Sequence, residues 1–176
     1  MYDVTMAPKE SAETGTNRYN NLDCSVARTL EHIGERWTFM VLRDAIYGVR
    51  RFDDFQTSLG IARNILTKRL TKLVDAGIMR KEAYQEHPPR YEYLLTEKGR
   101  DLVPILTSLL AWGDQWETEN QPPVRLIHTT CDSVMHSQSV CSECGGEINV
   151  FNLRLDPVPQ IVVERVLKAK LATHTT

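Results

Sequence analysis

Two pairs of side chains that commonly bind metal ions lie close together near the end of the chain. His128 and Cys131 are separated by two residues, and so are Cys141 and Cys144. Two such halves make up the closed tetrahedral site of a structural zinc ion, and the glycines that follow the second pair suit a tight turn. In the alternative, Cys131 is a core residue, His128 lies at the surface, and the other two cysteines are free thiols. The sequence predicts a structural zinc site here, with His136 as a further candidate ligand.

A group of basic side chains lies in the middle of the chain, between residues 61 and 72. This segment has no acid, although the whole chain has 23 Asp and Glu against 21 Lys and Arg, and a formal net charge of −2. Its cations are Arg63, Lys68, Arg69 and Lys72. The acidic total excludes a uniformly basic, histone-like surface, but it is compatible with a local basic patch.

An apolar stripe predicts a helix over residues 63–76 that packs on a core. The stripe consists of Leu66, Leu70, Leu73 and Val74. The opposite face carries Asn64, Thr67, Lys68 and Thr71. Lys68 can reach guanine acceptors, Asn64 can pair with adenine, and the two threonines can hydrogen-bond bases or phosphates. The pattern indicates a helix for the DNA major groove; an ordinary solvated helix face is the alternative.

Helices before and after this segment are expected to position it. Apolar spacing and glycine stops predict helices over residues 25–34, 37–46 and 52–60. Thr96 is a suitable N-cap for a later helix, which Pro104 either kinks or starts.

Between these helices, residues 78–85 and 90–95 favour extended chain. Two consecutive prolines make the tip between them rigid, so the segment predicts a β-hairpin. Arg90 and His87 lie at this tip, where a wing can contact phosphates or the minor groove. The order of elements predicts a mainly α fold with a hairpin wing, a winged helix-turn-helix.

The length of 176 residues fits one domain with a small appendage. We expect a flexible tail over residues 1–21, a DNA-binding and dimerisation domain over 22–118, and a small cysteine-containing α/β extension over 119–176. The extension is expected to end in a helix over residues 161–171. Without a signal peptide or a long apolar run, the sequence predicts a cytoplasmic protein with no membrane partner.

Several ordered motifs resemble the HxlR family of bacterial transcriptional regulators. They are CSVARTL (24–30), IGERW (33–37), RFDDF (51–55), GIARNILTKRL (60–70), PRYEYLLTEKG (89–99) and WGD (112–114). The resemblance covers about residues 24–118. It implies a dimeric winged-helix protein that binds double-stranded DNA, with its recognition helix at residues 63–76 and its wing at 78–95.

The resemblance also assigns a role to Cys24. It matches the N-terminal cysteine that senses electrophiles or oxidants in some members of the family. Cys24 precedes a predicted helix N-terminus, whose partial positive charge favours a thiolate. The alternative is a small apolar residue beneath a dimer interface.

The segment after Thr96 carries a heptad-like stripe. Its members are Leu102, Leu106, Leu109, Gly113 and Trp116. Together with Leu110 and Trp112, this apolar surface is wider than one small domain covers, which predicts a homodimer. A two-fold dimer would read a pseudo-palindromic operator. In the alternative, these residues close the core of a monomer.

Two other functions compete with a DNA-binding regulator. The first is a protein–protein adaptor in which a zinc-stabilised extension serves for docking. The second is a thiol oxidoreductase that uses Cys141 and Cys144, but this centre normally follows a βαβ unit that the sequence lacks. The sequence has no glycine-rich phosphate loop, H-E-x-x-H or G-x-S-x-G motif. We therefore expect no enzyme and no required cofactor, while the effector is unknown.

Overall fold

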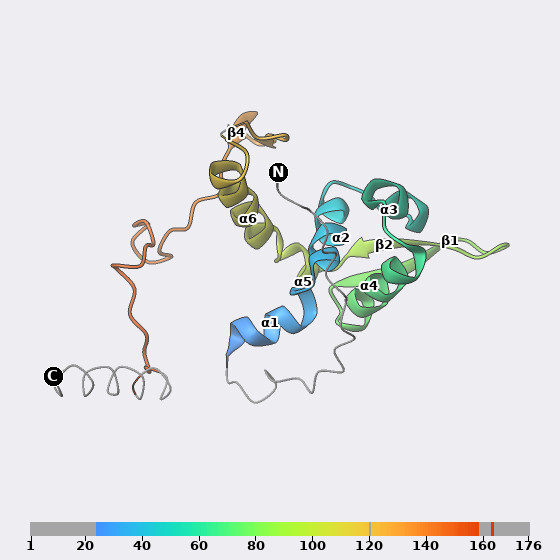
Figure 1. Ribbon diagram of the computed structural model, residues 1–176, viewed down its shortest axis with the longest axis horizontal. Helices are drawn as coiled ribbons and strands as arrows, with labels where there is room; N and C mark the ends of the chain where they lie inside the picture. Colours follow the sequence, from blue (N-terminus) through green and yellow to red (C-terminus); the bar gives the residue numbers. More distant parts are fainter. Residues whose placement is uncertain (1–23, 120, 159–162, 164–176) are drawn as a thin grey trace, which may run out of the picture. The chain divides into compact units, whose positions relative to one another are not determined.

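The computed structural model describes residues 24–119, 121–158 and 163 (Figure 1). The chain divides into two compact units, one up to Leu110 and the other from Ala111 onward. The tail expected over residues 1–21 lies outside the described residues. So does the helix expected over residues 161–171, apart from Val163.

The described part of the first unit contains four helices, a hairpin, a short fifth helix and the start of a longer sixth helix. The elements in order are α1 (Ser25–Ile33), α2 (Arg36–Ile46), α3 (Phe52–Leu59), α4 (Arg63–Asp75), β1 (Met79–Gln85), β2 (Arg90–Leu95), α5 (Glu97–Arg100) and α6 (Val103–Trp116). This order confirms the predicted fold class, mainly helical with a two-stranded antiparallel wing.

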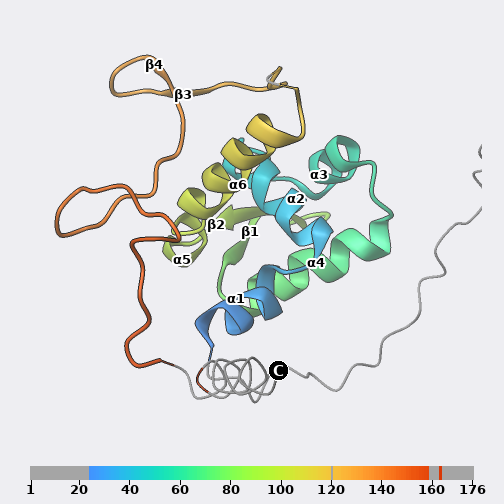
Figure 2. The ribbon, with the colours of Figure 1, turned by 60° about the vertical axis from the view of Figure 1, so that its left-hand side comes forward.

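The core of this unit lies among α2, α3, α4 and the base of the hairpin (Figure 2). Three leucines of the predicted stripe, Leu66, Leu70 and Leu73, are fully or almost fully buried. They pack in one cluster with Leu42 of α2 and Phe55 of α3. Burial of large apolar side chains from three helices holds α4 by one face and leaves its other face to solvent.

A tight turn joins α3 to α4. Gly60 adopts a left-handed conformation with φ +59°, which favours glycine, and its N–H donates to the Gln56 carbonyl at 3.0 Å. Ile61 then enters the core, and α4 begins at Arg63. The short connection sets α4 at a fixed angle to α3, as a helix-turn-helix requires.

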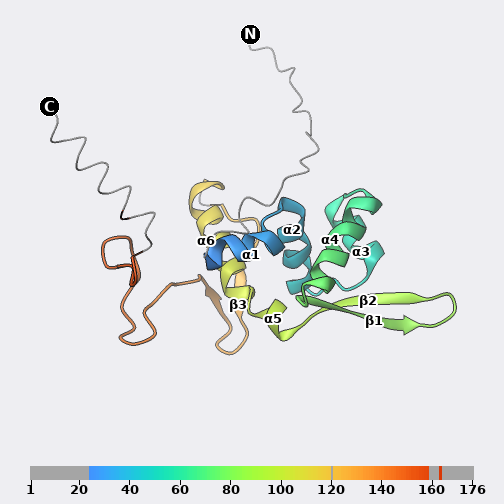
Figure 3. The same ribbon diagram turned by 90° about the horizontal axis from the view of Figure 1, so that it is seen from below.

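The hairpin projects from the helices as a long two-stranded arm (Figure 3). Its antiparallel register pairs Met79 with Leu95 at the base. The residues just before α3 extend this sheet, because the Tyr93 N–H donates to the Arg50 carbonyl at 2.8 Å and Arg51 pairs with Glu92. Hydrogen bonds to the body therefore anchor one side of the wing.

The segment after the wing forms two helices rather than one. Thr96 is confirmed as an N-cap, since its hydroxyl accepts the Gly99 N–H at 3.2 Å, but α5 ends at Arg100. The next helix, α6, begins at Val103 with Pro104 in its first turn, where the missing N–H breaks no hydrogen bond. Pro104 thus marks the start of α6.

The second unit contains a short hairpin of β3 (Leu126–His128) and β4 (Ser133–Met135). An isolated antiparallel bridge follows between Val140 and Glu147. None of the described residues from Ala111 onward is buried. Within the described ranges, no helix has both the length and the apolar character needed to cross a membrane.

Candidate nucleic-acid interface

The outer face of α4 presents the four polar side chains predicted for it. Asn64, Thr67, Lys68 and Thr71 are all exposed. The Asn64 Oδ1 accepts the Ile65 N–H at 2.9 Å, and the Thr67 hydroxyl donates to the Arg63 carbonyl at 2.9 Å. Among the described residues, no carboxylate lies within ion-pair distance of Lys68. The ammonium of Lys68 is thus available to an external acceptor.

Arg63 lies at the N-terminal end of the same helix. Its guanidinium lies 4.6 Å from the centroid of the Phe52 ring, and its Nη1 lies 3.5 Å from Asp53 Oδ1. Both charged side chains are largely exposed, so this ion pair is weak and competes poorly with a phosphate. The stack on Phe52 positions Arg63 without neutralising it.

The other two cations of α4 are held by the residue that precedes α2. Arg69 forms an ion pair with Glu35, and its side chain is only 16% exposed. The Lys72 Nζ lies 3.9 Å from the second oxygen of the same carboxylate, and Lys72 is half-buried. One of the seven residues predicted to contact DNA, Lys72, is therefore engaged with the body of the domain.

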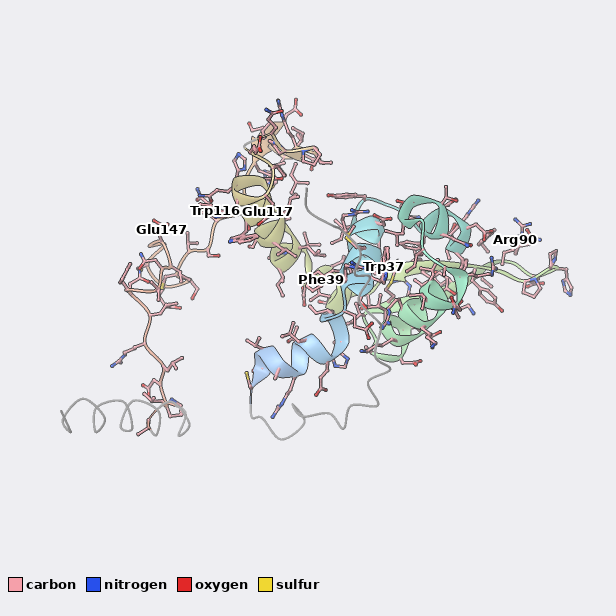
Figure 4. The ribbon with its side chains drawn as sticks, in the orientation of Figure 1. Trp37, Phe39, Arg90, Trp116, Glu117 and Glu147 are labelled. Atoms are coloured by element: carbon pink, nitrogen blue, oxygen red, sulfur yellow. The ribbon has the colours of Figure 1, made fainter. Side chains whose placement is uncertain are left out.

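The structure brings Arg63 and Arg90 together along one groove. The groove has a volume of about 500 Å³ and lies between the start of α4, α3 and the wing. Arg90 lies on the outer part of the wing (Figure 4). Two arginines that the sequence placed on separate elements thus line a single groove.

Arg51 also lines this groove and was missed by the sequence prediction. Its guanidinium lies 4.5 Å from the centroid of the Tyr84 ring, and its Nε donates to Glu92 at 3.3 Å. The sequence feature that could have indicated this position is the pair Arg50 and Arg51 immediately before Phe52. Their pairing with the wing, however, depends on the tertiary fold. Asp53 and Asp54 also line the groove, so its charge is mixed.

Tyrosines line the wing side of the groove. Burial raises the pKa of Tyr93, and the neighbouring Tyr91 raises it further. The Lys81 Nζ lies 3.9 Å from the centroid of the Tyr91 ring. The Tyr93 hydroxyl is a neutral group that does not repel a phosphate.

Cys24 is the N-cap residue of α1 and is exposed. No side-chain hydrogen bond caps the helix at this position. The exposure agrees with a sensor thiol, and its role stays a prediction.

The four predicted zinc ligands form two separate pairs. The His128 Nδ1 lies 3.3 Å from the Cys131 Sγ. Hydrogen bonds from the backbone N–H groups of Cys144 and Glu143 lower the pKa of Cys141, and the Cys144 side chain lowers it further. No group of three or more candidate ligands gathers within the described part of the chain, so the structure does not bring the two pairs together.

The predicted apolar stripe after Thr96 divides between core and surface. Leu102 and Leu106 pack against the core of the first unit. The exposed stripe of α6 consists of Ile105, Leu109, Trp112 and Trp116, which are 47%, 52%, 55% and 64% exposed. Val26 and Leu30 of α1 are likewise exposed, whereas Ile33 enters the core. The exposed apolar surface therefore includes Ile105, which was not in the predicted stripe, and lacks Leu102 and Leu106, which were.

A family model described as HxlR-like helix-turn-helix matches residues 32–121. An uncharacterised HTH-type transcriptional regulator of Mycobacterium tuberculosis is 42% identical over 150 residues, which are 85% of this chain and 91% of the relative. The fold is similar to the crystal structure of PA1607, a candidate transcription factor, with a TM-score of 0.71 and 35% identity over 78% of this chain and 96% of that one. A candidate transcription factor of Pseudomonas aeruginosa, PA1374, has a TM-score of 0.54 and 36% identity over 75% and 90% of the two chains.

Proposed function

Because this chain belongs to the HxlR-like helix-turn-helix family of transcriptional regulators, we propose that it binds a specific DNA operator as a homodimer. In this proposal α4 lies in the major groove, and the wing contacts the sugar-phosphate backbone or the minor groove. The protein acts as a regulator in the cytoplasm and needs neither catalysis nor a cofactor for DNA binding.

The observation that carries the proposal is the division of α4 into two faces. One face is fixed in the core by Leu66, Leu70 and Leu73, and the opposite face offers an exposed ammonium, an amide and two hydroxyls. A major groove about 12 Å wide admits one helix, and base edges there present acceptors to Lys and paired donor and acceptor atoms to Asn. We assign base contacts to Lys68 and Asn64, and supporting contacts to Thr67 and Thr71.

Phosphate contacts are assigned to the arginines beside this helix. Arg63, Arg51 and Arg90 line the groove that joins α4 to the wing. Cations around a recognition helix position the protein on the duplex without reading its sequence. Lys72 has a smaller role here than the sequence suggested, since Glu35 already offsets its charge.

Dimerisation is assigned to the exposed stripe of α6. Four large apolar side chains follow one another at intervals of three or four residues along it, with Leu109 and Trp112 in the middle. Exposed apolar side chains in such an array favour an interface. Val26 and Leu30 of α1 in a second copy provide a matching apolar surface. Two-fold symmetry then calls for half-sites about one helical turn, ~10 bp, or a multiple of it apart.

Selection of bound fragments from genomic DNA tests this proposal and does not require the operator sequence to be known. The full chain is expected to enrich a pseudo-palindromic motif, and Lys68→Ala to lose that enrichment. Arg154→Ala, which removes an exposed cation from the second unit, is the matched control and should enrich the same motif. If the wild type selects no motif, or Lys68→Ala selects it equally well, α4 is not a recognition helix and the adaptor function is favoured.

A further inference from the structure

The two pairs of candidate metal ligands in the second unit lie in turns of the same form. Each turn places its first ligand at the end of one extended segment and its second ligand three residues later. In each, the residue after the second ligand has a positive φ, 52° at Asp132 and 69° at Gly145. The sequences HTTCDS and CSECGG share no glycine position that would by itself impose this likeness.

The backbone hydrogen bonds of the two turns also correspond. The Asp132 N–H donates to the His128 carbonyl at 2.8 Å, and the Gly145 N–H donates to the Cys141 carbonyl at 2.9 Å. Strand pairing closes each turn one residue further on: His128 pairs with Ser133, and the Cys141 N–H donates to the Gly146 carbonyl at 2.8 Å. Each six-residue turn thus presents two ligands at one end of a short hairpin.

In the first turn, the two ligand side chains face one another. The 3.3 Å between His128 Nδ1 and Cys131 Sγ is close to the separation of about 3.6 Å expected for a nitrogen and a sulfur on one tetrahedral zinc ion.

The described residues of the second unit form no buried core. No described residue after Leu110 is buried, and apolar side chains on both hairpins, such as Val134 and Val140, are 50% exposed. Segments this small seldom bury enough apolar surface to fold alone, and a structural metal commonly replaces the core.

We propose that His128, Cys131, Cys141 and Cys144 bind one structural zinc ion, and that the two matching turns close onto it from opposite sides. Three thiolates and an imidazole form a closed tetrahedral set for zinc with no position left for water. Binding releases the protons of the three thiols and draws the two hairpins together. The site is independent of the proposed DNA contacts, because none of its ligands lies in the first unit.

Zinc content and thiol protection of the purified full chain test the proposal. The chain should hold one zinc per protomer, and alkylation should then modify only Cys24, the cysteine outside the second unit. After chelation, all four cysteines should react. Substitution by cobalt should give the intense visible absorption of a tetrahedral site with thiolate ligands.

Variants distinguish a ligand from a residue that merely supports the fold. Cys131→Ser and Cys144→Ser should lose zinc, whereas Cys24→Ser and His136→Ala should keep it. His128→Cys preserves a four-ligand set and should retain zinc with a shifted cobalt spectrum. The proposal is overturned by a chain that takes up no zinc under reducing conditions, by full zinc content in Cys131→Ser, or by a Cys141–Cys144 disulfide in place of the metal.

Discussion

The guanidinium of Arg69 on α4 forms an ion pair with the carboxylate of Glu35, the residue immediately before α2. The same carboxylate also lies near the Lys72 ammonium. This arrangement divides the four cations of the basic segment into two sets. Arg69 and Lys72 fix α4 to the body of the domain, whereas Arg63 and Lys68 remain exposed to solvent.

The first prediction concerns the stability of this arrangement. Arg69→Ala should lower the free energy of unfolding by about 1 kcal/mol, because it removes a half-buried ion pair and leaves Glu35 without its principal partner. Lys68→Ala, on the exposed face of the same helix, should leave the stability unchanged. Urea unfolding monitored by circular dichroism measures both values. Equal stability of the two variants would contradict the structural role of Arg69.

The second prediction concerns sequence recognition. Lys68→Ala and Asn64→Ala should each weaken binding to the selected operator by ~1–3 kcal/mol, the value of one lost base contact, with the fold intact. Binding to unrelated DNA should change much less. Fluorescence anisotropy with both duplexes provides the comparison. A uniform loss on both duplexes would reassign Lys68 to phosphate contacts.

The third prediction concerns the wing. Arg90 is exposed on the outer part of the hairpin, so Arg90→Ala should weaken binding to all sequences similarly. It should also reduce the slope of log Kd against log salt concentration by about 1, since one phosphate contact is lost. Titrations at several salt concentrations measure this slope. An unchanged slope would remove the wing from the interface.

The fourth prediction concerns assembly. Leu109→Glu should convert a dimer into a monomer, because a charge replaces a 52% exposed apolar side chain at the middle of the proposed interface. Val124→Asp changes another exposed apolar residue, off both α1 and α6, and should remain dimeric. Light scattering should give twice the chain mass of 20.1 kDa for the wild type and the control. A wild type with the mass of one chain at every concentration would disprove the dimer.

The elements of the first unit could be predicted from the sequence because their signals are local. Leucine spacing along α4, the glycine after α3 and the Thr96 cap act through residues that lie within one or two helical turns. The same local patterns predicted the exposed face of α4 and the hairpin tip at Arg90. The spacing of His128, Cys131, Cys141 and Cys144 likewise predicts a zinc site in the second unit, and this assignment stays a prediction.

The tertiary structure decided which of these side chains stay exposed and which contact residues of other elements. Glu35 reaches Arg69 only because α2 packs against α4, and Arg51 joins the groove only because the chain before α3 pairs with the wing. On α6, packing buries Leu106 more than Leu109, although both belong to one predicted stripe. Side-chain spacing along one element determines its faces, but the neighbour that covers each face comes from distant parts of the chain, so its effect appears only once the elements have packed together.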